Sequence, residues 1–454
     1  MLNIKTDSRK VKKGDIFVAL KGISSNGDDY VADAIKNGAS KIISSTKEYE
    51  VETIIVPDTR KYLEDYLKEN YSKIIDEMTL ICVTGTNGKT TTSFLAYELL
   101  NRLGMKCGYV GSVGYYLDKF ICEVPNSTPD ICDMYEYIIN AYDMGYRYFA
   151  IEASSQGISY GRLNTFKFDY VIFTNLTHEH LDFHKTMENY MLAKKEVFYQ
   201  IKDGGKAIVN IDDSYSSNYL IDTNTNITYG KKESDYRISD IKTNLDNTLF
   251  KLNGKDIISS LQGEYNVYNL VPVIAILTDM GISLDTYINQ IASLTEPEGR
   301  NEKIKYKDNL VVVDYAHTPD GFEKISSAYK NVGINNLYIV FGACGNRDRS
   351  KRPLMLEEAC KNAKYVIVTD YNLNGEDGDQ IINDVCKDAK YDNFEVIRDR
   401  YKAIEKGISL LDSNDVLLIL GHGQERLLDI GNKKIEFDDR KVAKKIIDSL
   451  KTTI

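Results

Sequence analysis

The segment TGTNGKTT, from Thr84 to Thr91, constrains the fold of this chain more than any other feature of the sequence. It ends the apolar run LICVTG, which is typical of a buried strand, and it leads into TNGKTTTSFLAYELLNRLG, which has the apolar spacing of a helix. A glycine-rich loop between a strand and a helix is the context that a phosphate-binding loop requires. Backbone N–H groups there would hold phosphate oxygens. We expect Lys89 to reach the β- and γ-phosphates and the Thr90 hydroxyl to bind Mg²⁺.

The charge balance and the cysteine pattern exclude several other classes of protein. Lys and Arg total 57 and Asp and Glu total 67, a formal charge of −10, which disfavours a nucleic-acid partner. Seven Cys without a C-x-x-C pair indicate neither a disulfide framework nor a zinc ribbon. No apolar run approaches the roughly 18 residues of a membrane span. We expect a cytoplasmic protein without a membrane span.

The 454 residues suggest about three domains. Residues 1–77 hold short strand-like runs around the helical stretch YVADAIKNGA, which predicts a small α/β domain. Residues 78–299 carry the phosphate loop among alternating strands and helices, which predicts a mostly parallel sheet. Residues 300–454 contain five apolar strand-like runs, which predict a Rossmann-like domain. Ligands are expected in the clefts between such domains.

Three of the five histidines lie in the segment HEHLDFH, at His178, His180 and His184. One interpretation is a divalent metal site, similar to but one residue out of step with the H-x-H-x-D-H motif of dinuclear zinc hydrolases. The other is a polar loop with a single Mg²⁺ or substrate contact. A two-metal hydrolase would need further histidines, and only His317 and His422 are left, so the second interpretation is favoured.

A carboxylate ends another predicted strand. The run RYFAIEAS places Glu152 just after apolar residues and just before Ser154 and Ser155. In phosphate-loop enzymes, an acid at the end of a neighbouring strand completes the Mg²⁺ site. The alternative is a solvated glutamate beside two helix-capping serines.

Eight motifs in order make the chain resemble the Mur ligase family, and most closely its MurE type: GTNGKTT, EASSQG, TNLTHEHLDFHKTMENYMLAKKEVF, GEYNVYN, GRNEKI, DYAHTPD, FGACGNRDRSKRPLM and FDDRKVA. The resemblance implies an ATP- and Mg²⁺-dependent ligase of peptidoglycan synthesis. It would join a free amino acid to UDP-N-acetylmuramoyl-L-Ala-D-Glu through an acyl phosphate. Apart from the resemblance, we expect the protein to be a monomer. The implied fold is a UDP-sugar-binding domain (1–77), an ATP-binding domain (78–299) and an amino-acid-binding domain (300–454).

The resemblance also implies the roles of individual residues. Catalysis is assigned to Lys89, Glu152, His180 and Lys194, the last as a carbamate. Metal binding is assigned to Thr90, Glu152, His180 and Lys194. Nucleotide binding is assigned to Gly85, Thr86, Asn87, Gly88, Lys89, Thr90, Thr91, Asn266, Asn269, Arg300 and Asp314. Substrate binding is assigned to Ser8, Thr128, Ser154, Arg162, Arg347, Asn372, Asn374, Gly421 and Glu425.

The chain departs from the family pattern where the incoming amino acid is selected. The family motif D-N-P-R, whose Arg holds a distal carboxylate, reads Tyr371, Asn372, Leu373 and Asn374 here. An amide cannot supply that charge, so selection for a second carboxylate is weakened, and lysine or another diamino acid is expected. Arg347 and Arg352 are expected to be available for a carboxylate.

Other functions stay open at this point. A divergent relative could join another amino acid or use another acceptor, and a regulatory protein could keep ATP binding without ligation. The presence of Lys194 and His180 argues against the regulatory protein. A simple phosphate-loop switch and a folate-polyglutamylating ligase are disfavoured, because neither requires the domain predicted over residues 1–77.

Overall fold

The computed structural model describes residues 2–22, 26–221 and 226–452. The chain forms two compact units. The first unit comprises residues 1–82, 100–171 and 196–206, and the second comprises 83–99, 172–195 and 207–454. Three strands, named below as β5, β10 and β11, begin in the first unit and end in the second.

The first unit begins with a small parallel sheet. Its strand order is β1-β2-β3-β4, and each neighbouring pair is parallel. Phe17 and Ile42 of the sheet pack with Val31 and Ala34 of α1, as the apolar pattern of this region predicts. The elements are β1 (Ile4–Lys5), η1 (Ser8–Lys10), β2 (Ile16–Val18), η2 (Gly27–Tyr30), α1 (Val31–Lys36), β3 (Lys41–Ser44), β4 (Glu52–Ile55) and α2 (Thr59–Glu77).

The rest of the first unit carries strands in the order β10-β5-β9-β6-β7-β8. Strands β6 and β9 are parallel, whereas β6, β7 and β8 form antiparallel pairs that the apolar pattern did not predict. The elements are β5 (Thr79–Thr84), β6 (Cys107–Gly111), β7 (Gly114–Tyr116), β8 (Phe120–Cys122), α4 (Ile131–Asp143), β9 (Tyr148–Glu152), α5 (Ser155–Ser159), β10 (Phe168–Phe173) and η3 (Glu196–Gln200).

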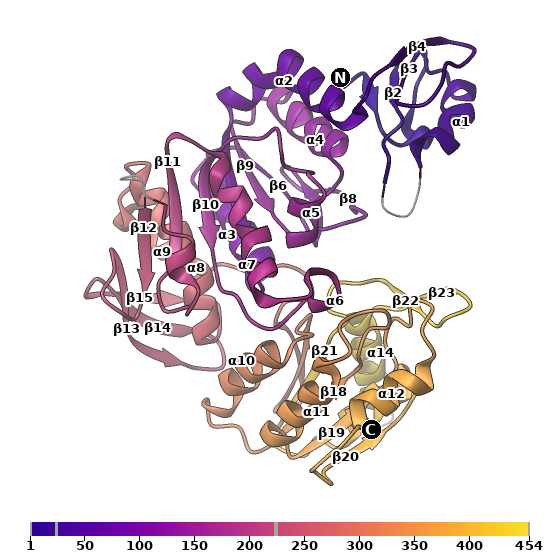
Figure 1. Ribbon diagram of the computed structural model, residues 1–454. Coiled ribbons are helices and arrows are strands. Elements are labelled where there is room, and N and C mark those ends of the chain that lie inside the picture. The colour runs from indigo at the N-terminus through magenta and orange to yellow at the C-terminus, as the bar shows by residue number, and fades with distance from the viewer. Residues whose placement is uncertain (1, 23–25, 222–225, 453–454) are drawn as a thin grey trace. The chain divides into compact units, whose positions relative to one another are not determined.

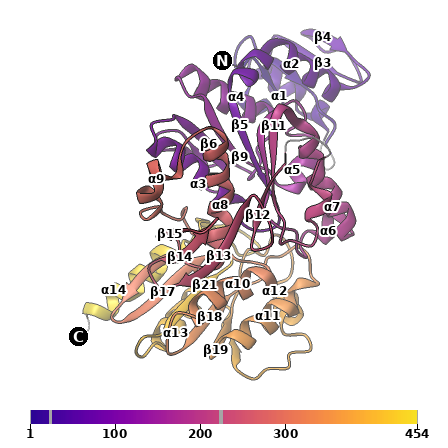
Figure 2. The same ribbon diagram turned by 90° about the vertical axis from the view of Figure 1, so that its left-hand side faces the viewer.

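The second unit contains the helix that follows the phosphate loop and a strand run in the order β15-β14-β13-β12-β11. The pairs β11–β12 and β12–β13 are parallel, and β13, β14 and β15 are antiparallel, with α8 packed along them (Figure 2). The elements are α3 (Lys89–Arg102), α6 (Leu181–His184), α7 (Met187–Lys195), β11 (Ile201–Asn210), η4 (Ser216–Asn218), β12 (Asn226–Gly230), β13 (Tyr236–Thr243), β14 (Thr248–Leu252), β15 (Lys255–Ser259), α8 (Glu264–Asp279) and α9 (Leu284–Ile291).

A further sheet of the second unit has the order β16-β17-β21-β18-β19-β20 and is parallel except for the edge pair β16–β17. The elements are β16 (Glu302–Tyr306), β17 (Asn309–Asp314), α10 (Pro319–Lys330), β18 (Leu337–Phe341), α11 (Lys351–Asn362), β19 (Tyr365–Val368), α12 (Gly378–Cys386), β20 (Phe394–Val396), α13 (Arg400–Ser409), β21 (Val416–Leu420), β22 (Leu427–Asp429), β23 (Lys434–Glu436) and α14 (Asp439–Thr452).

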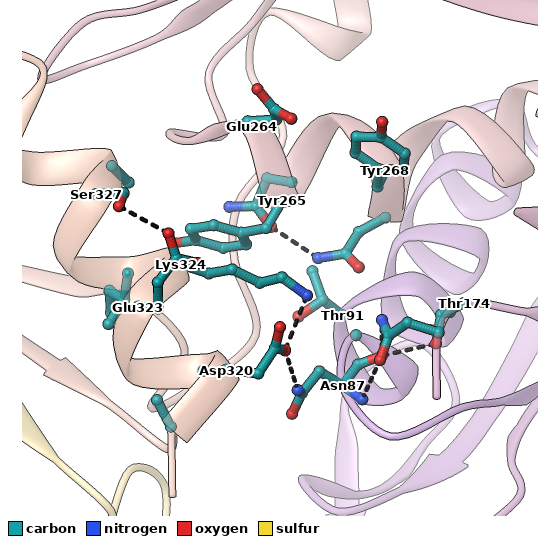
Figure 3. Close-up of a pocket in the computed structure, with 18 of the residues that line it drawn as sticks. Asn87, Thr91, Thr174, Glu264, Tyr265, Tyr268, Asp320, Glu323, Lys324 and Ser327 are labelled. Atoms are coloured by element: carbon teal, nitrogen blue, oxygen red, sulfur yellow. Dashed lines mark hydrogen bonds and ion pairs between the residues drawn. The ribbon is translucent and has the colours of Figure 1, made fainter. Parts of the chain in front are cut away.

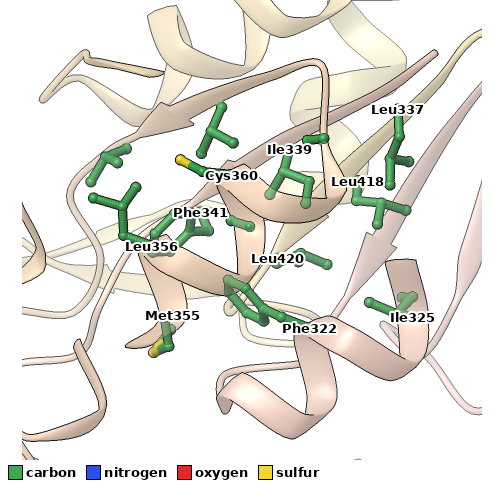
Figure 4. Packing of buried hydrophobic residues seen from close by; sticks show 14 of the residues in the cluster. Phe322, Ile325, Leu337, Ile339, Phe341, Met355, Leu356, Cys360, Leu418 and Leu420 are labelled. Carbon is green, nitrogen blue, oxygen red and sulfur yellow. The ribbon is translucent and has the colours of Figure 1, made fainter. Parts of the chain in front are cut away.

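Alternate residues of these strands face two different cores. Ile339, Phe341 and Leu418 pack beneath α10, α11 and α12 (Figure 4), whereas Val340 and Ile419 pack against α13 and α14. Helices therefore cover both faces of the sheet (Figure 1), and its strands are apolar on both sides, as the five apolar runs predicted. Among the helices of the described residues, none is both long and apolar enough to cross a membrane.

Candidate active site

The phosphate loop lies between the end of β5 at Thr84 and the start of α3 at Lys89. Gly88 has φ +86°, and a Cβ atom there would lie 2.3 Å from Asn269 Oδ1. Glycine is therefore required twice over, for the backbone conformation and for the close approach of α8. Lys89 Nζ donates to Thr86 O at 2.8 Å, which folds this side chain back over the loop.

Residues at the end of β10 hold the loop in this shape. Thr86 N donates to Asn175 O at 2.8 Å, and Asn87 N donates to Asn175 Oδ1 at 2.9 Å. Thr174 Oγ1 donates to Asn87 O at 2.7 Å. These bonds satisfy the loop backbone from outside, so its conformation is set before any ligand binds.

A cavity of about 1120 Å³ adjoins the loop within the second unit (Figure 3). Its walls come from the phosphate loop, α8, the segment around Arg300 and the start of α10. Seven residues that the resemblance assigned to the nucleotide line it: Asn87, Gly88, Thr91, Asn266, Asn269, Arg300 and Asp314.

The contacts of these residues order the cavity wall. Asn269 Nδ2 donates to Asn266 Oδ1 at 3.0 Å, so the two amides on α8 orient one another. Arg300 Nη2 donates to Thr90 Oγ1 at 3.1 Å, which joins the segment before β16 to the phosphate loop. Asp314, at the end of β17, accepts from the backbone N–H groups of residues 301 and 316, and burial raises the pKa of its carboxyl group.

Two partly buried histidines of the second unit, His180 and His317, have depressed pKa values. Burial, with the positive charge of Lys194 next in weight, lowers the pKa of His180 to about 2. Burial likewise lowers the pKa of His317 to about 3. His180 has φ +56°, in the left-handed region that a side chain rarely adopts, and its buried Nδ1 makes no hydrogen bond. The backbone strain and the unpartnered imidazole nitrogen therefore lie at a residue that the resemblance assigned to catalysis and metal binding.

Lys194 is buried at the end of α7 rather than exposed on the surface of a helix. Its Nζ donates to Gly85 O at 2.7 Å and lies 4.6 Å from the centroid of the Tyr190 ring. Within the described residues, no group of three or more His, Cys, Asp or Glu side chains is placed to hold a metal ion. A zinc-hydrolase site built from His178, His180 and His184 is therefore absent from this part of the chain.

A third group of predicted residues gathers around Glu425. Its Oε2 accepts from Tyr371 OH at 2.9 Å and from Asn372 Nδ2 at 2.7 Å, and burial raises its pKa. Gly421 directly follows β21 and has φ +103°. Asn374 Nδ2 donates to Cys344 Sγ at 3.0 Å.

The arginines near this group differ in their availability. Arg347 is exposed, and its charge acts on the Cys344 thiol and the Tyr315 hydroxyl. Arg352 is buried, and its Nη1 and Nη2 bind Glu376 at 2.8 and 2.6 Å. The prediction that Arg352 is available for a substrate carboxylate is therefore wrong, because the side chain already holds one.

In the first unit, Thr128, Ser154 and Arg162 form one cluster. Ser154 N donates to Thr128 Oγ1 at 2.9 Å, and Arg162 Nη1 donates to Thr128 O at 2.7 Å. Glu152, two residues before Ser154, accepts from Ser112 N at 2.8 Å. Ser8 belongs to the N-terminal sheet region, where its carbonyl accepts from Asn37 Nδ2 at 2.9 Å.

Two pairs that the sequence analysis did not identify also touch the site. Asp320 Oδ2, on α10, accepts from Asn87 Nδ2 at 2.7 Å. Lys351 Nζ, on α11, binds Glu179 Oε1 at 2.8 Å in a buried ion pair beside His180. The motif DYAHTPD contains Asp320 and could have drawn attention to it, whereas nothing local connects residues 179 and 351.

A phosphate loop at the end of one set of strands, with a cavity completed by a second α/β sheet, defines a nucleotide-binding protein built from several α/β domains. Three family models cover most of the sequence: "Mur ligase family, catalytic domain" over residues 2–77, "Mur ligase middle domain" over 83–277, and "Mur ligase, glutamate ligase domain" over 299–423. The chain belongs to the Mur ligase family of ATP-dependent amide ligases, and its three-domain α/β architecture is the predicted one.

Relatives along the whole chain agree with this assignment. A UDP-N-acetylmuramoyl-L-alanyl-D-glutamate--2,6-diaminopimelate ligase of Clostridium perfringens is 34% identical over 98% of this chain and 95% of its own. The enzyme of the same name from Caldanaerobacter subterraneus is 35% identical, over 97% and 93%. A solved structure with that ligase name is 30% identical at a TM-score of 0.67, covering 99% of this chain and 95% of its own. A MurF ligase of Thermotoga maritima in complex with ADP has the same fold, at 20% identity and a TM-score of 0.74, covering 100% and 98%.

Proposed function

We propose that this protein joins a diamino acid to UDP-N-acetylmuramoyl-L-Ala-D-Glu with hydrolysis of ATP to ADP and phosphate, in peptidoglycan synthesis. One observation carries the proposal: the phosphate loop, Arg300 in the segment before β16 and Asp314 at the end of β17 line the same cavity. ATP bound there is held from both sides, so its γ-phosphate is fixed in position for transfer. The names of the curated relatives supply the acceptor.

The chemistry needs little beyond positioning and charge neutralisation. A carboxylate oxygen of the acceptor attacks the γ-phosphorus, and ADP leaves. The amine of the incoming amino acid then attacks the acyl carbon, loses a proton, and phosphate leaves with the carboxylate oxygen. Lys89 and Arg300 would neutralise phosphate charge, and the bond from Arg300 to Thr90 supports this role. His180 and His317, whose pKa values are depressed, would add no positive charge.

Mg²⁺ fits the donors at the phosphate loop. The ion takes oxygen ligands and is commonly bound through one or two protein groups and substrate phosphates. The Thr90 hydroxyl at the start of α3 is such a donor. When bound, Mg²⁺ neutralises charge on the β- and γ-phosphates. Glu152 and His180 stay proposals as further ligands.

Lys194 is proposed to be carbamylated. Its neutral amine would add CO₂ and release a proton, giving an anionic N-carboxylate in place of an ammonium. The burial of Lys194 and its bond to Gly85 O in the phosphate loop support this proposal. Depleting CO₂ from the buffer should lower turnover, and bicarbonate should restore it. A Lys194→Arg variant should not respond, and equal turnover of the wild type in both buffers would contradict the carbamate.

The amino-acid side of the site supports a ligand that ends in an ammonium group. Glu425 is held by the neutral hydroxyl and amide donors of Tyr371 and Asn372, and Asn374 carries no charge. The Glu425 side chain is 30% exposed, and the charge of Arg400 also acts on it. A carboxylate that is accessible in this way attracts a cationic ligand. Lysine or a similar diamino acid is therefore proposed ahead of a ligand with two carboxylates, although the relatives are named for diaminopimelate.

A scan of single amino acids tests the proposal. Purified protein with ATP, Mg²⁺ and the UDP-linked acceptor should release phosphate with lysine or ornithine, and mass spectrometry should show the acceptor plus one amino-acid residue. Diaminopimelate should turn over more slowly, and Asn374→Arg should raise its rate relative to lysine. Phosphate release without any product of higher mass, for every amino acid, would overturn the proposal. It would favour a divergent ligase that uses another acceptor.

A further inference from the structure

The cavity beside the phosphate loop is more acidic than a site for a polyphosphate should be. Among the described residues that line it, seven carry carboxylates and three carry basic groups. The acidic ones are Asp212, Asp213, Glu264, Glu296, Asp314, Asp320 and Glu323, and the basic ones are Lys242, Arg300 and Lys324. An anionic ligand entering such a cavity needs positive charge placed close to its phosphates.

Asp320 lies where its charge matters most. It is in the first turn of α10, and its Oδ2 accepts from the side chain of Asn87 in the phosphate loop at 2.7 Å (Figure 3). Both residues line the cavity. The phosphate loop is expected to receive the phosphates of the ligand. A carboxylate that is hydrogen-bonded to this loop repels them unless a cation neutralises its charge.

Lys324 supplies that cation. It lies one helical turn after Asp320 on α10, and its Nζ is 2.8 Å from the same Oδ2 atom (Figure 3). The side chains of Lys324 and Asp320 are 36% and 26% exposed. Ion pairs between partly exposed side chains four residues apart on a helix are weak. The ammonium can therefore leave Asp320 at little cost when a stronger anion arrives.

We propose that Lys324 is a nucleotide-binding residue, which pairs with Asp320 while the cavity is empty and turns to the phosphates of ATP when the nucleotide binds. Asp320 keeps the lysine beside the phosphate loop, and the lysine cancels the charge that Asp320 brings to the loop. The motif DYAHTPD ends at Asp320 and does not include Lys324. The inference rests on ATP as the ligand of this cavity, but not on the acceptor or the amino acid of the proposed function.

Calorimetric titration of the full chain with ATP, ADP and adenosine tests the role of Lys324. Lys324→Met should weaken ATP binding by about tenfold, the size of one lost charge-assisted contact, and ADP binding by less. Adenosine binding should not change, because adenosine has no phosphates. Lys324→Arg should keep most of the ATP affinity. Lys330→Met is the matched control, since Lys330 lies on the same helix, is exposed and contacts Asn362.

A second variant separates charge compensation from a structural effect. Asp320→Asn keeps an oxygen acceptor for Asn87 but removes the charge that Lys324 cancels. Adding Asp320→Asn to Lys324→Met should therefore recover most of the lost ATP affinity. Equal losses for ATP and adenosine in Lys324→Met, an unchanged ATP affinity, or no recovery in the double variant would each overturn the inference. The titration contains no acceptor, so a protein that passes it yet joins no amino acid would overturn only the proposed function.

Discussion

At the scale of single residues, this molecule keeps histidines neutral around its nucleotide cavity. His317 lines the cavity and is partly buried, and its Nδ1 contacts Tyr315 O at 2.8 Å. Burial removes the water that would stabilise an imidazolium, and the nearby charges of Lys351 and Arg300 add to the effect. A neutral ring carries no positive charge, so it does not compete with the lysines for the phosphates of the nucleotide.

The depressed pKa of His317 makes the stability of the fold depend on pH. The unfolded chain takes up a proton near pH 6.5, while the folded chain does so only near pH 3, so this stabilisation is present above pH 6.5 and is lost as the pH falls. Between pH 7.5 and 5.5 we expect His317 to account for about 1.4 kcal/mol of lost unfolding free energy. Urea unfolding of His317→Gln should show a pH dependence smaller by that amount. The same pH dependence in variant and wild type would contradict the buried neutral ring.

At the scale of elements, the sequence predicts structure best where the signal is local. The apolar runs around Ile339 and Leu418 predicted strands, because a strand with helices on both faces is apolar throughout. The phosphate loop was predicted for the same reason, since its glycines, lysine and flanking elements lie within 25 residues. The strands β13 to β15 were missed, although Asn253 and Gly254, both with positive φ, form the two-residue hairpin turn between β14 and β15.

Contacts between elements that are far apart in the sequence could not be predicted from the sequence. Asn87 meets Asp320 across 233 positions, and Glu179 meets Lys351 across 172. Neither pair has a periodicity or a motif that joins its members, because each depends on where α10 and α11 begin in space. The resemblance supplied the residues of the cavity wall, but not these pairs.

Gly88 provides a test of the phosphate loop as an element. It has φ +86°, and a Cβ there would meet Asn269 Oδ1 at 2.3 Å. Gly104 has a similar φ of +76°, but a Cβ there would meet nothing within 4 Å. Both alanine variants should lose about 1 kcal/mol or more of unfolding free energy to backbone strain. Only Gly88→Ala should also lose ATP affinity, by tenfold or more, in a nucleotide titration. Equal ATP affinities of the two variants would show that the close approach of Asn269 does not matter.

At the scale of the whole molecule, the second unit joins its phosphate-loop part to its C-terminal sheet through polar contacts at the site. Lys351 on α11 binds Glu179, and His178 Nε2 lies 3.1 Å from Asp348 Oδ2. The side chains of the first pair are each 5% exposed. His178 and Glu179 directly precede His180, which has a positive φ. The bonds that they make to the C-terminal part of the unit therefore also restrain His180.

Removing one partner of the buried pair should therefore be costly. Lys351→Met leaves the Glu179 carboxylate buried without a cation, which costs about 3–5 kcal/mol when such a pair is broken. Glu179→Gln in addition should recover much of that loss in thermal unfolding, because the unpaired charge is gone. Turnover should fall in both variants, because neither keeps the ion pair that holds the segment before His180 in place. Additive losses in the double variant would contradict a direct interaction.

The most direct test of the central claim follows an oxygen atom. If the protein is an acyl-phosphate ligase, an acceptor labelled with ¹⁸O in its reacting carboxylate must pass one labelled oxygen to the phosphate that is released. We expect phosphate carrying one ¹⁸O for each amide formed, measured by mass spectrometry with ATP, the UDP-linked acceptor and lysine. Unlabelled phosphate, with its new oxygen taken from water, would show that the nucleotide is merely hydrolysed and would contradict the account.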